Sequence, residues 1–232
     1  MHPDEIPDSC RKKYRAGNAV KLFPITFFQT RVPNNDEIKD ILVPKLLEDS
    51  KELAPPKGWL TNKLRTSFDG EKPGKEVFFG KDDTYQTILE QKYAYCIDSI
   101  FDAHYRIAID EIWYNVYQEN EWQETHDHLG MGGDGPQFSC IHFLSFDPNR
   151  HEPPTFKDPM HQLRSLSLEL ARNKYEEIWV PDITEGDLIV FPSYLQHAVP
   201  PGPATKDYPR ITIAFNFKVL SYAVPLEEDN DD

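Results

Sequence analysis

The chain has few cysteines, and it lacks any long apolar run. Cys10, Cys96 and Cys140 are its only cysteines in 232 residues, and no two of them form a C-x-x-C pair. This scatter argues against a disulfide framework or a thiolate zinc site and favours a reducing compartment. No apolar stretch approaches a membrane span, and no apolar run follows a basic segment near the start. We therefore expect a soluble, cytoplasmic protein with no membrane partner.

Positive charge is also in deficit. The chain carries 39 acidic and 25 basic residues, a net charge of −14, with part of the excess in the tail 227–232. Because binding to nucleic acid depends on Lys and Arg that neutralise phosphates, a nucleic-acid partner is not expected. Neither a G-x-G-x-x-G nor a G-x-x-x-x-G-K pattern occurs, so the Gly-rich turn 131–136 is no phosphate loop. The sequence carries no signal for oligomeric state.

From residue 111 the chain consists of short strand patterns separated by turns, which is typical of a jelly roll or a related barrel. The predicted strands cover 112–117, 122–126, 138–146, 178–180, 188–191 and 210–219. Residues 161–177 have a helical pattern and predict an insertion between strands. We expect one domain, in which 111–219 form the core, 1–110 support it and 220–232 are an acidic tail.

The first half predicts a loose arm and a few supporting elements. We expect an arm over 1–20, a strand over 20–28 and a helix capped at 34–36 that Pro44 either interrupts or kinks. Residues 54–82 predict a long loop with Trp59 and Phe68 as anchors. The strongest helix pattern covers 84–107, with Ile88, Tyr95, Ile97, Ile100 and Phe101 as its apolar face.

Two histidine patterns point to a metal site. His126 and His128 would share one face of a strand while Asp127 points away, because side chains alternate along a strand. His197 follows a buried-looking strand that Gly186 and Asp187 open. Three imidazoles on one face would leave three positions of an octahedral iron open. H-x-H alone would fit surface or core histidines, but its order with the later strand and His197 favours a metal. His142 is expected to be a hydrogen-bonded structural histidine.

A second group of residues suits an acidic ligand. Arg210 and Thr212 share a face by the same alternation, and an arginine fork with a hydroxyl can seat the distal carboxylate of a dicarboxylic acid. Asn115 and Tyr117 form another pair on one face that can hydrogen-bond an acid or keto group. The alternative for this pair is structural, with Asn115 in a turn and Tyr117 in a wall.

The chain resembles the 2-oxoglutarate- and iron(II)-dependent oxygenases of the double-stranded β-helix fold, and most closely the small members from bacteriophages and marine bacteria. The resemblance covers about 111–219 and rests on these segments: 113–117 (WYNVY), 123–128 (QETHDH), 186–197 (GDLIVFPSYLQH) and 209–216 (PRITIAFN). It implies a mainly β fold with flanking helices, a jelly-roll or cupin-like barrel.

The resemblance also implies an activity. The enzyme would use O2 to convert 2-oxoglutarate to succinate while hydroxylating a substrate, either a protein prolyl residue or a small metabolite. The metal histidines would fall on His126 and His197, the cosubstrate arginine on Arg210, and an Asn-x-Tyr pair on Asn115 and Tyr117. If the protein is viral, its location would be the host cytoplasm.

One departure from the family pattern concerns the second ligand. The widespread motif is His-x-Asp or His-x-Glu, whereas this chain has His128 there, so Asp127 is a rival ligand if the strand bulges. Two further functions stay open: a cupin-type three-histidine metalloprotein that does not use 2-oxoglutarate, and a non-catalytic jelly-roll binding module.

Overall fold

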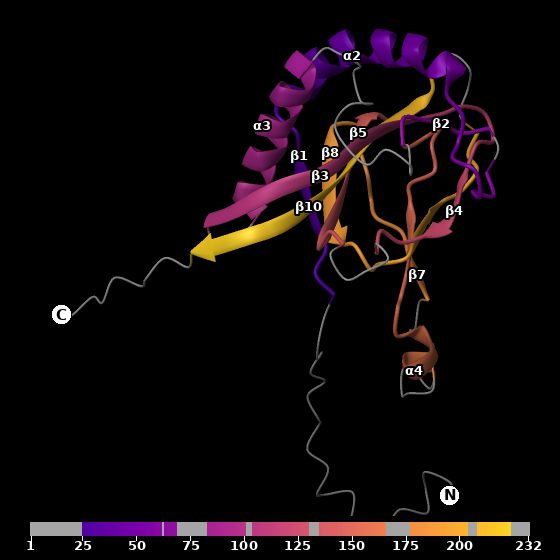
Figure 1. The fold of residues 1–232 in the computed structure, drawn as a ribbon. Coiled ribbons are helices and arrows are strands. Elements are labelled where there is room, and N and C mark those ends of the chain that lie inside the picture. The colour runs from indigo at the N-terminus through magenta and orange to yellow at the C-terminus, as the bar shows by residue number, and fades with distance from the viewer. Residues whose placement is uncertain are drawn as a thin grey trace, which may run out of the picture.

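Two antiparallel sheets pack against each other to form the barrel (Figure 1). The structure is a computed structural model that describes residues 25–61, 63–68, 83–100, 104–129, 135–165, 177–203 and 208–223. The larger sheet has the order β1 (Phe28–Arg31), β8 (Asp187–Pro192), β5 (Phe138–Ser145), β10 (Arg210–Ala223), β3 (His104–Tyr117), β2 (Arg65–Thr66). The smaller has the order β4 (Gln123–His126), β9 (His197–Val199), β6 (Thr155–Lys157), β7 (Ile178–Trp179). This confirms the mainly β, double-stranded β-helix architecture.

Strand β10 shows how the sequence pattern divides the two faces of the larger sheet. Its odd-numbered residues from Ile211 to Phe217 are fully buried in a cluster that includes residues of the two long helices. Among its even-numbered residues over the same stretch, Arg210, Thr212 and Asn216 are polar and also buried, and Ala214 is apolar. Because side chains alternate along a strand, these polar groups lie on the opposite face, inside the barrel. Buried polar side chains need hydrogen-bond partners, so this inner face is a candidate binding site.

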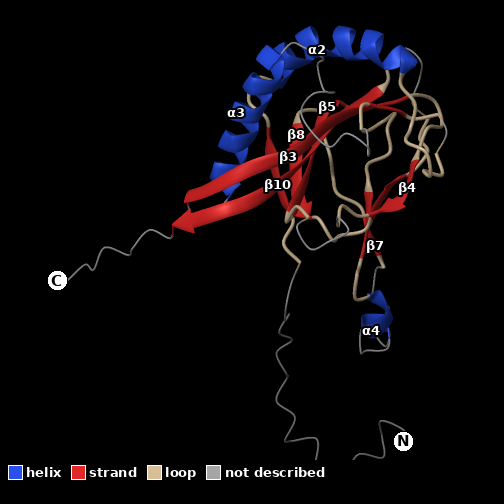
Figure 2. Ribbon diagram, in the orientation of Figure 1, coloured by secondary structure: helices blue, strands red, loops and turns tan. Residues whose placement is uncertain are grey.

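The two long helices cover the outer face of the larger sheet (Figure 2). Helix α2 (Asn35–Asp49) buries Ile38, Leu42 and Leu46 at intervals of four residues, the spacing of one helix face. It runs through Pro44, which is exposed, so the proline is accommodated without ending the helix. A short 3-10 turn, η2 (Ser50–Glu52), follows, and α4 (His161–Ser165) lies at the far end of the molecule.

Helix α3 (Asp83–Ile100) lies beside α2 on the same face. It buries Tyr93, Cys96 and Ile97, so the predicted apolar face is wrong at Ile88 and Tyr95, which are exposed. The helix is also shorter than predicted. Residues 104–107 belong to β3, because they pair with the distal part of β10 from Ala223 back to Val219. This long-range pairing overrides the local helical pattern.

Strand β8 opens at the predicted Gly-Asp turn. Gly186 has φ +85°, a conformation in which a Cβ would lie 3.1 Å from the Asn35 Cβ, so both the turn and the packing require glycine. The buried Asp187 carboxylate accepts hydrogen bonds from the Thr184 backbone N–H and hydroxyl. The turn thereby sets the start of the strand that leads to His197.

Some boundaries differ from the predictions, and others fall outside the described residues. Strand β1 starts at Phe28 rather than 20, although 20–24 are not among the described residues. The expected limits at 110 and 219 fall inside β3 and β10, which each run for 14 residues. The arm 1–20 and most of the acidic tail lie outside the described residues, and so does the insertion beyond α4, up to 176. No described helix is long and apolar enough to cross a membrane.

Candidate metal and cosubstrate site

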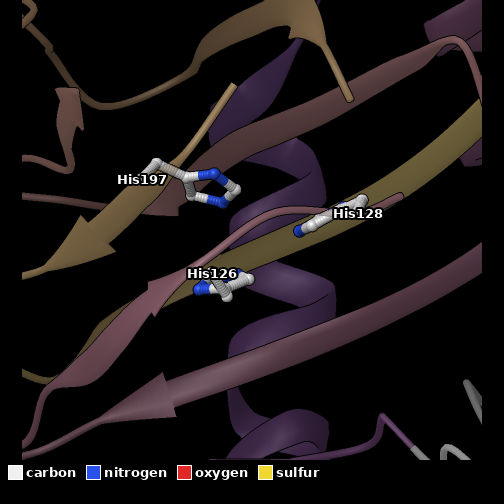
Figure 3. A group of neighbouring side chains, drawn as sticks. All are labelled: His126, His128 and His197. Carbon is white, nitrogen blue, oxygen red and sulfur yellow. The ribbon is translucent and has the colours of Figure 1, made fainter. Parts of the chain in front are cut away.

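Three imidazoles meet where β4 and β9 pair. His126 ends β4 and lies opposite His197, the first residue of β9. His128 follows β4 and is positioned by a 2.9 Å hydrogen bond from its backbone N–H to the Ser193 carbonyl. One ring nitrogen from each histidine lies within 4.8 Å of the others. Figure 3 shows the three side chains around a common space, so they can bind one metal ion together.

Hydrogen bonds orient each ring. The Nδ1 atom of His126 lies 2.8 Å from the Glu124 carbonyl, and that of His197 lies 3.0 Å from the Leu195 carbonyl. A carbonyl only accepts, so each Nδ1 carries the proton and donates. The lone pair of each ring is then on Nε2, the atom left for a metal. This is how most metal-binding histidines are fixed.

The third ring is oriented through a side-chain relay. His128 Nδ1 lies 2.7 Å from Asn216 Oδ1, and Asn216 Nδ2 donates to Glu111 Oε2 at 3.1 Å. An ionised carboxylate only accepts, so Glu111 fixes the direction of the amide, and the amide oxygen then requires a proton on His128 Nδ1. Ser139 adds a donor to the same amide oxygen at 2.8 Å. Glu111 therefore determines the His128 tautomer through the Asn216 amide.

Burial keeps the three imidazoles neutral. Desolvation lowers the pKa of His126 and lowers the pKa of His128 to about 4. Desolvation, together with the other two rings, holds the pKa of His197 well below its usual value. Neutral imidazole is the form that binds a metal, so the site is ready for one at neutral pH.

Asp127 lies near the three rings but outside their cluster. Its Oδ1 accepts a 3.1 Å hydrogen bond from the Leu129 backbone N–H, and its carboxylate is not part of the three-imidazole cluster. The reason differs from the predicted strand alternation, because β4 ends at His126 and His128 is no longer on a strand. The geometry of the described residues thus favours His128 over Asp127 as the second ligand.

The predicted carboxylate seat is formed by cross-strand pairs. Arg210 lies opposite Tyr117, and Thr212 lies opposite Asn115, so all four share the inner face of β10 and β3. Arg210 is 3% exposed, with its guanidinium carbon 4.8 Å from the centre of the Tyr117 ring. Burial lowers its pKa to about 10, so the group stays charged at neutral pH.

Two polar atoms of this seat lack partners. Among the described residues, Arg210 Nε and Asn115 Oδ1 are buried without any hydrogen bond, and no described carboxylate forms an ion pair with Arg210. A buried charge without a counterion is costly, so a ligand is expected to supply the missing carboxylate. The residues present therefore fit a dianionic keto acid beside a metal held by imidazoles.

A protein-family comparison finds a match to this region. Residues 111–216 match the family described as "Putative 2OG-Fe(II) oxygenase". Residues 111–216 are therefore similar to the proteins of this family. The matched residues include all three imidazoles and Arg210. Among curated proteins, none matches the chain.

Solved structures with a similar fold include two prolyl hydroxylases and one protein with 2-oxoglutarate bound. A Pseudomonas putida prolyl-4-hydroxylase is 14% identical, with a TM-score of 0.52, and 85% of this chain and 94% of that chain are covered. HygX from Streptomyces hygroscopicus, with nickel, 2-oxoglutarate and hygromycin B bound, is 11% identical with a TM-score of 0.53, and 84% of each chain is covered. A Trichoplax adhaerens prolyl hydroxylase with a hypoxia inducible factor peptide is 13% identical with a TM-score of 0.53, at 83% of each chain. At these identities the similarity shows the fold alone.

Sequence reasoning missed several residues of this site. The sequence analysis gave Asn216 no role of its own. Asn216 lies on the same face of β10 as Arg210, so strand alternation could have predicted that it faces the site. Gln123 Oε1 accepts a 2.9 Å hydrogen bond from the Tyr117 hydroxyl, and the Gln123 amide nitrogen is 3.4 Å from His126 Nε2. His142 is structural, as expected, bonded between Tyr93 and Asn35 on the outer face.

Removing the relay to His128 is expected to weaken metal binding. Asn216→Ala removes the nearer acceptor of the His128 Nδ1–H, leaves only the Ser139 hydroxyl at 3.0 Å, and disconnects Glu111. Loss of such a supporting residue lowers metal affinity about 10- to 100-fold. Titration calorimetry with Mn(II) measures the change, and Asn149→Ala, an exposed turn residue, is the control. Wild-type affinity in Asn216→Ala would show that His128 does not need the relay.

Metal binding is expected to vary little with pH from about 8 to about 6. Histidines with the ordinary pKa near 6.5 would lose metal affinity as pH falls through that value, because protons compete for the ligand atoms. Here the folded pKa values lie below it, with His128 at about 4, so competition begins only at lower pH. Mn(II) titrations across this pH range measure whether the metal affinity falls. A loss above about tenfold from pH 7 to pH 6 would contradict it.

Proposed function

We propose that the protein is an oxygenase that holds Fe(II) on His126, His128 and His197 and binds the distal carboxylate of 2-oxoglutarate with Arg210. The observation that carries the proposal is the buried guanidinium, without an ion pair to any described residue, on the barrel interior that also holds the imidazole cluster. A metal with three protein ligands on one side keeps positions for a keto acid and O2. The enzyme is a 2-oxoglutarate-dependent hydroxylase.

The bound iron supplies the oxidation: one oxygen atom of O2 enters succinate as 2-oxoglutarate loses CO2, and the other converts a substrate C–H to C–OH. The chain's own residues supply position and environment. Arg210 presents its fork to the far carboxylate, and Thr212 and Asn115 lie in register beside it. Phe143 and Phe146, with guanidinium-to-ring distances of 5.7 and 5.8 Å, exclude water from the same charge.

The other two functions account for less of the site. A cupin-type metalloprotein without a keto acid has no use for a buried, unpaired arginine. A non-catalytic binding module has no use for three neutral imidazoles that aim their lone pairs at one point. The oxygenase proposal uses both features.

Further assignments accompany this proposal. The chain acts as one domain with 111–219 as its catalytic core, and its lineage is with the small bacteriophage and marine-bacterial members. A cytoplasmic location, the host's if the protein is viral, is supported by Cys96 and Cys140, which are free and buried. The substrate is a protein side chain such as prolyl, by analogy with the two prolyl hydroxylases, or a small metabolite.

The test is the visible charge-transfer band that Fe(II) forms with 2-oxoglutarate when O2 is excluded. The band should appear on mixing the protein with both, and succinate should form once O2 is admitted. Iron binding without a band would favour the cupin-type function. If neither iron nor keto acid binds, the barrel is a binding module.

A further inference from the structure

A cavity of about 510 Å³ opens beside the metal cluster. Its lining includes His126, His128 and Asn216, so a molecule in the cavity would lie against the imidazole site. The volume is within the usual range for a small ligand or a long side chain. If the proposed function holds, this is where the primary substrate binds, and the lining describes its chemistry.

One wall of the cavity is aromatic. Trp59 and Phe68 stack with ring centres 5.7 Å apart, and Phe68 meets Trp113 edge to face at 5.2 Å. Trp59 also stacks over His126 at 6.4 Å, so the wall reaches the metal ligands. Tryptophan faces are the best side-chain acceptors of a cation, and all three rings also accept an apolar body.

The remaining charge on the lining is negative. Four carboxylates line the cavity: Asp110, Glu111, Glu124 and Asp127. No described Lys or Arg does. Lys218 neutralises Asp110 at 2.9 Å. Within the described part of the chain the other three form no ion pair, so a net negative charge remains.

Hydrogen bonds hold these three carboxylates in place. Glu124 accepts the Leu60 backbone N–H at 2.8 Å, and Asp127 accepts that of Leu129 at 3.1 Å. Glu111 accepts the Asn216 amide with Oε2. Glu111 Oε1 and Asp127 Oδ2 have no hydrogen-bond partner among the described residues. Fixed charges of one sign without partners attract a ligand of the other sign.

The metal centre does not cancel this charge. Three imidazoles are neutral, so Fe(II), the 2-oxoglutarate dianion and the Arg210 guanidinium together would carry a charge of only about +1 against the three carboxylates of the lining. Arg210 is not part of that lining. In this chain the negative field is in the cavity, on the side where the substrate enters.

We propose that the primary substrate is a cation, an amine or guanidinium carried on an apolar or ring-containing body, rather than a neutral prolyl side chain. This inference rests on the proposed function. The positive group would lie among Glu111, Glu124 and Asp127, and the body would pack on Trp59, Phe68 and Trp113. A carbon of that body would face the metal cluster. Anionic substrates are excluded by the same charges.

The test uses small ring probes and protein loaded with Zn(II) and 2-oxoglutarate, which cannot turn over. Benzylammonium and benzyltrimethylammonium are cations, the second without a lone pair for the metal, and benzyl alcohol is the neutral match. Saturation-transfer NMR titration gives each affinity. Both cations should bind about tenfold tighter than the alcohol, and raising NaCl from about 0.01 M to about 0.5 M should weaken only the cations.

Variants that remove charge test whether the carboxylates of the cavity cause the preference for cations. Glu124→Gln with Asp127→Asn keeps the acceptor oxygens and removes two charges, so the preference for cations should fall to about threefold or less. Asp40→Asn, on the exposed face of α2, removes a charge elsewhere and should keep the full preference. Equal affinities for cations and alcohol, no binding of any probe, or an undiminished preference in the double variant would overturn the inference.

The charge-transfer band separates this inference from the proposed function. A protein that forms the band but shows no cation preference keeps the proposed function and loses the substrate class. A protein that forms no band loses the proposed function, whatever binds in the cavity.

Discussion

Replacing His197 by alanine is expected to abolish metal binding and 2-oxoglutarate turnover together. The ring is 3% exposed, and its centre lies 4.3 Å from that of His126 and 5.1 Å from that of His128, so it completes the cluster. Without it only two imidazoles remain. The loss of Mn(II) affinity should exceed the roughly 100-fold limit typical of a supporting residue. Calorimetry and succinate formation measure the two effects.

Controls separate this loss from misfolding. His197→Gln keeps most of the side-chain volume but provides no imidazole, and it should fail in the same way as the alanine variant. His161→Ala removes an imidazole on α4, outside the cluster, and should bind Mn(II) like the wild type. If His197→Ala folds and keeps wild-type metal affinity, His197 is a core histidine.

Local patterns predicted the parts of the site that alternate along one strand. Arg210 and Thr212 lie on one face of β10 because of the strand pleat, and Asn115 and Tyr117 do so on β3. What the pattern could not supply is the register between the strands. The pairing of Arg210 with Tyr117 depends on long-range hydrogen bonds, and this pairing turns two separate motifs into one seat.

The features of the site that the sequence did not predict also depend on long-range contacts. The relay from Glu111 to His128 joins residues 105 positions apart at one step and 88 at the next, so no local pattern contains it. Strands β6 and β9 have three residues each, too few for a periodic signal. His128 lies in the cluster although β4 ends at His126. A backbone hydrogen bond to Ser193, rather than strand alternation, positions it.

Arg210→Met is expected to lower the affinity for 2-oxoglutarate by about 100-fold or more, with metal affinity unchanged. The guanidinium is the only proposed partner of the far carboxylate that carries a full charge, and its pKa of about 10 keeps it charged at neutral pH. The Michaelis constant for 2-oxoglutarate and the intensity of the charge-transfer band measure the loss. Arg210→Lys should be intermediate, because it keeps the charge and loses the planar fork.

The same variant separates a binding role from a structural one. A buried charge without a protein counterion destabilises the ligand-free fold, so Arg210→Met should be no less stable than the wild type in urea when 2-oxoglutarate is absent. Added 2-oxoglutarate should then stabilise only the wild type, because a ligand that binds the native state shifts unfolding by mass action. A strongly destabilised Arg210→Met that binds 2-oxoglutarate normally would make the arginine a packing residue. The carboxylate seat would then have to be elsewhere in the barrel.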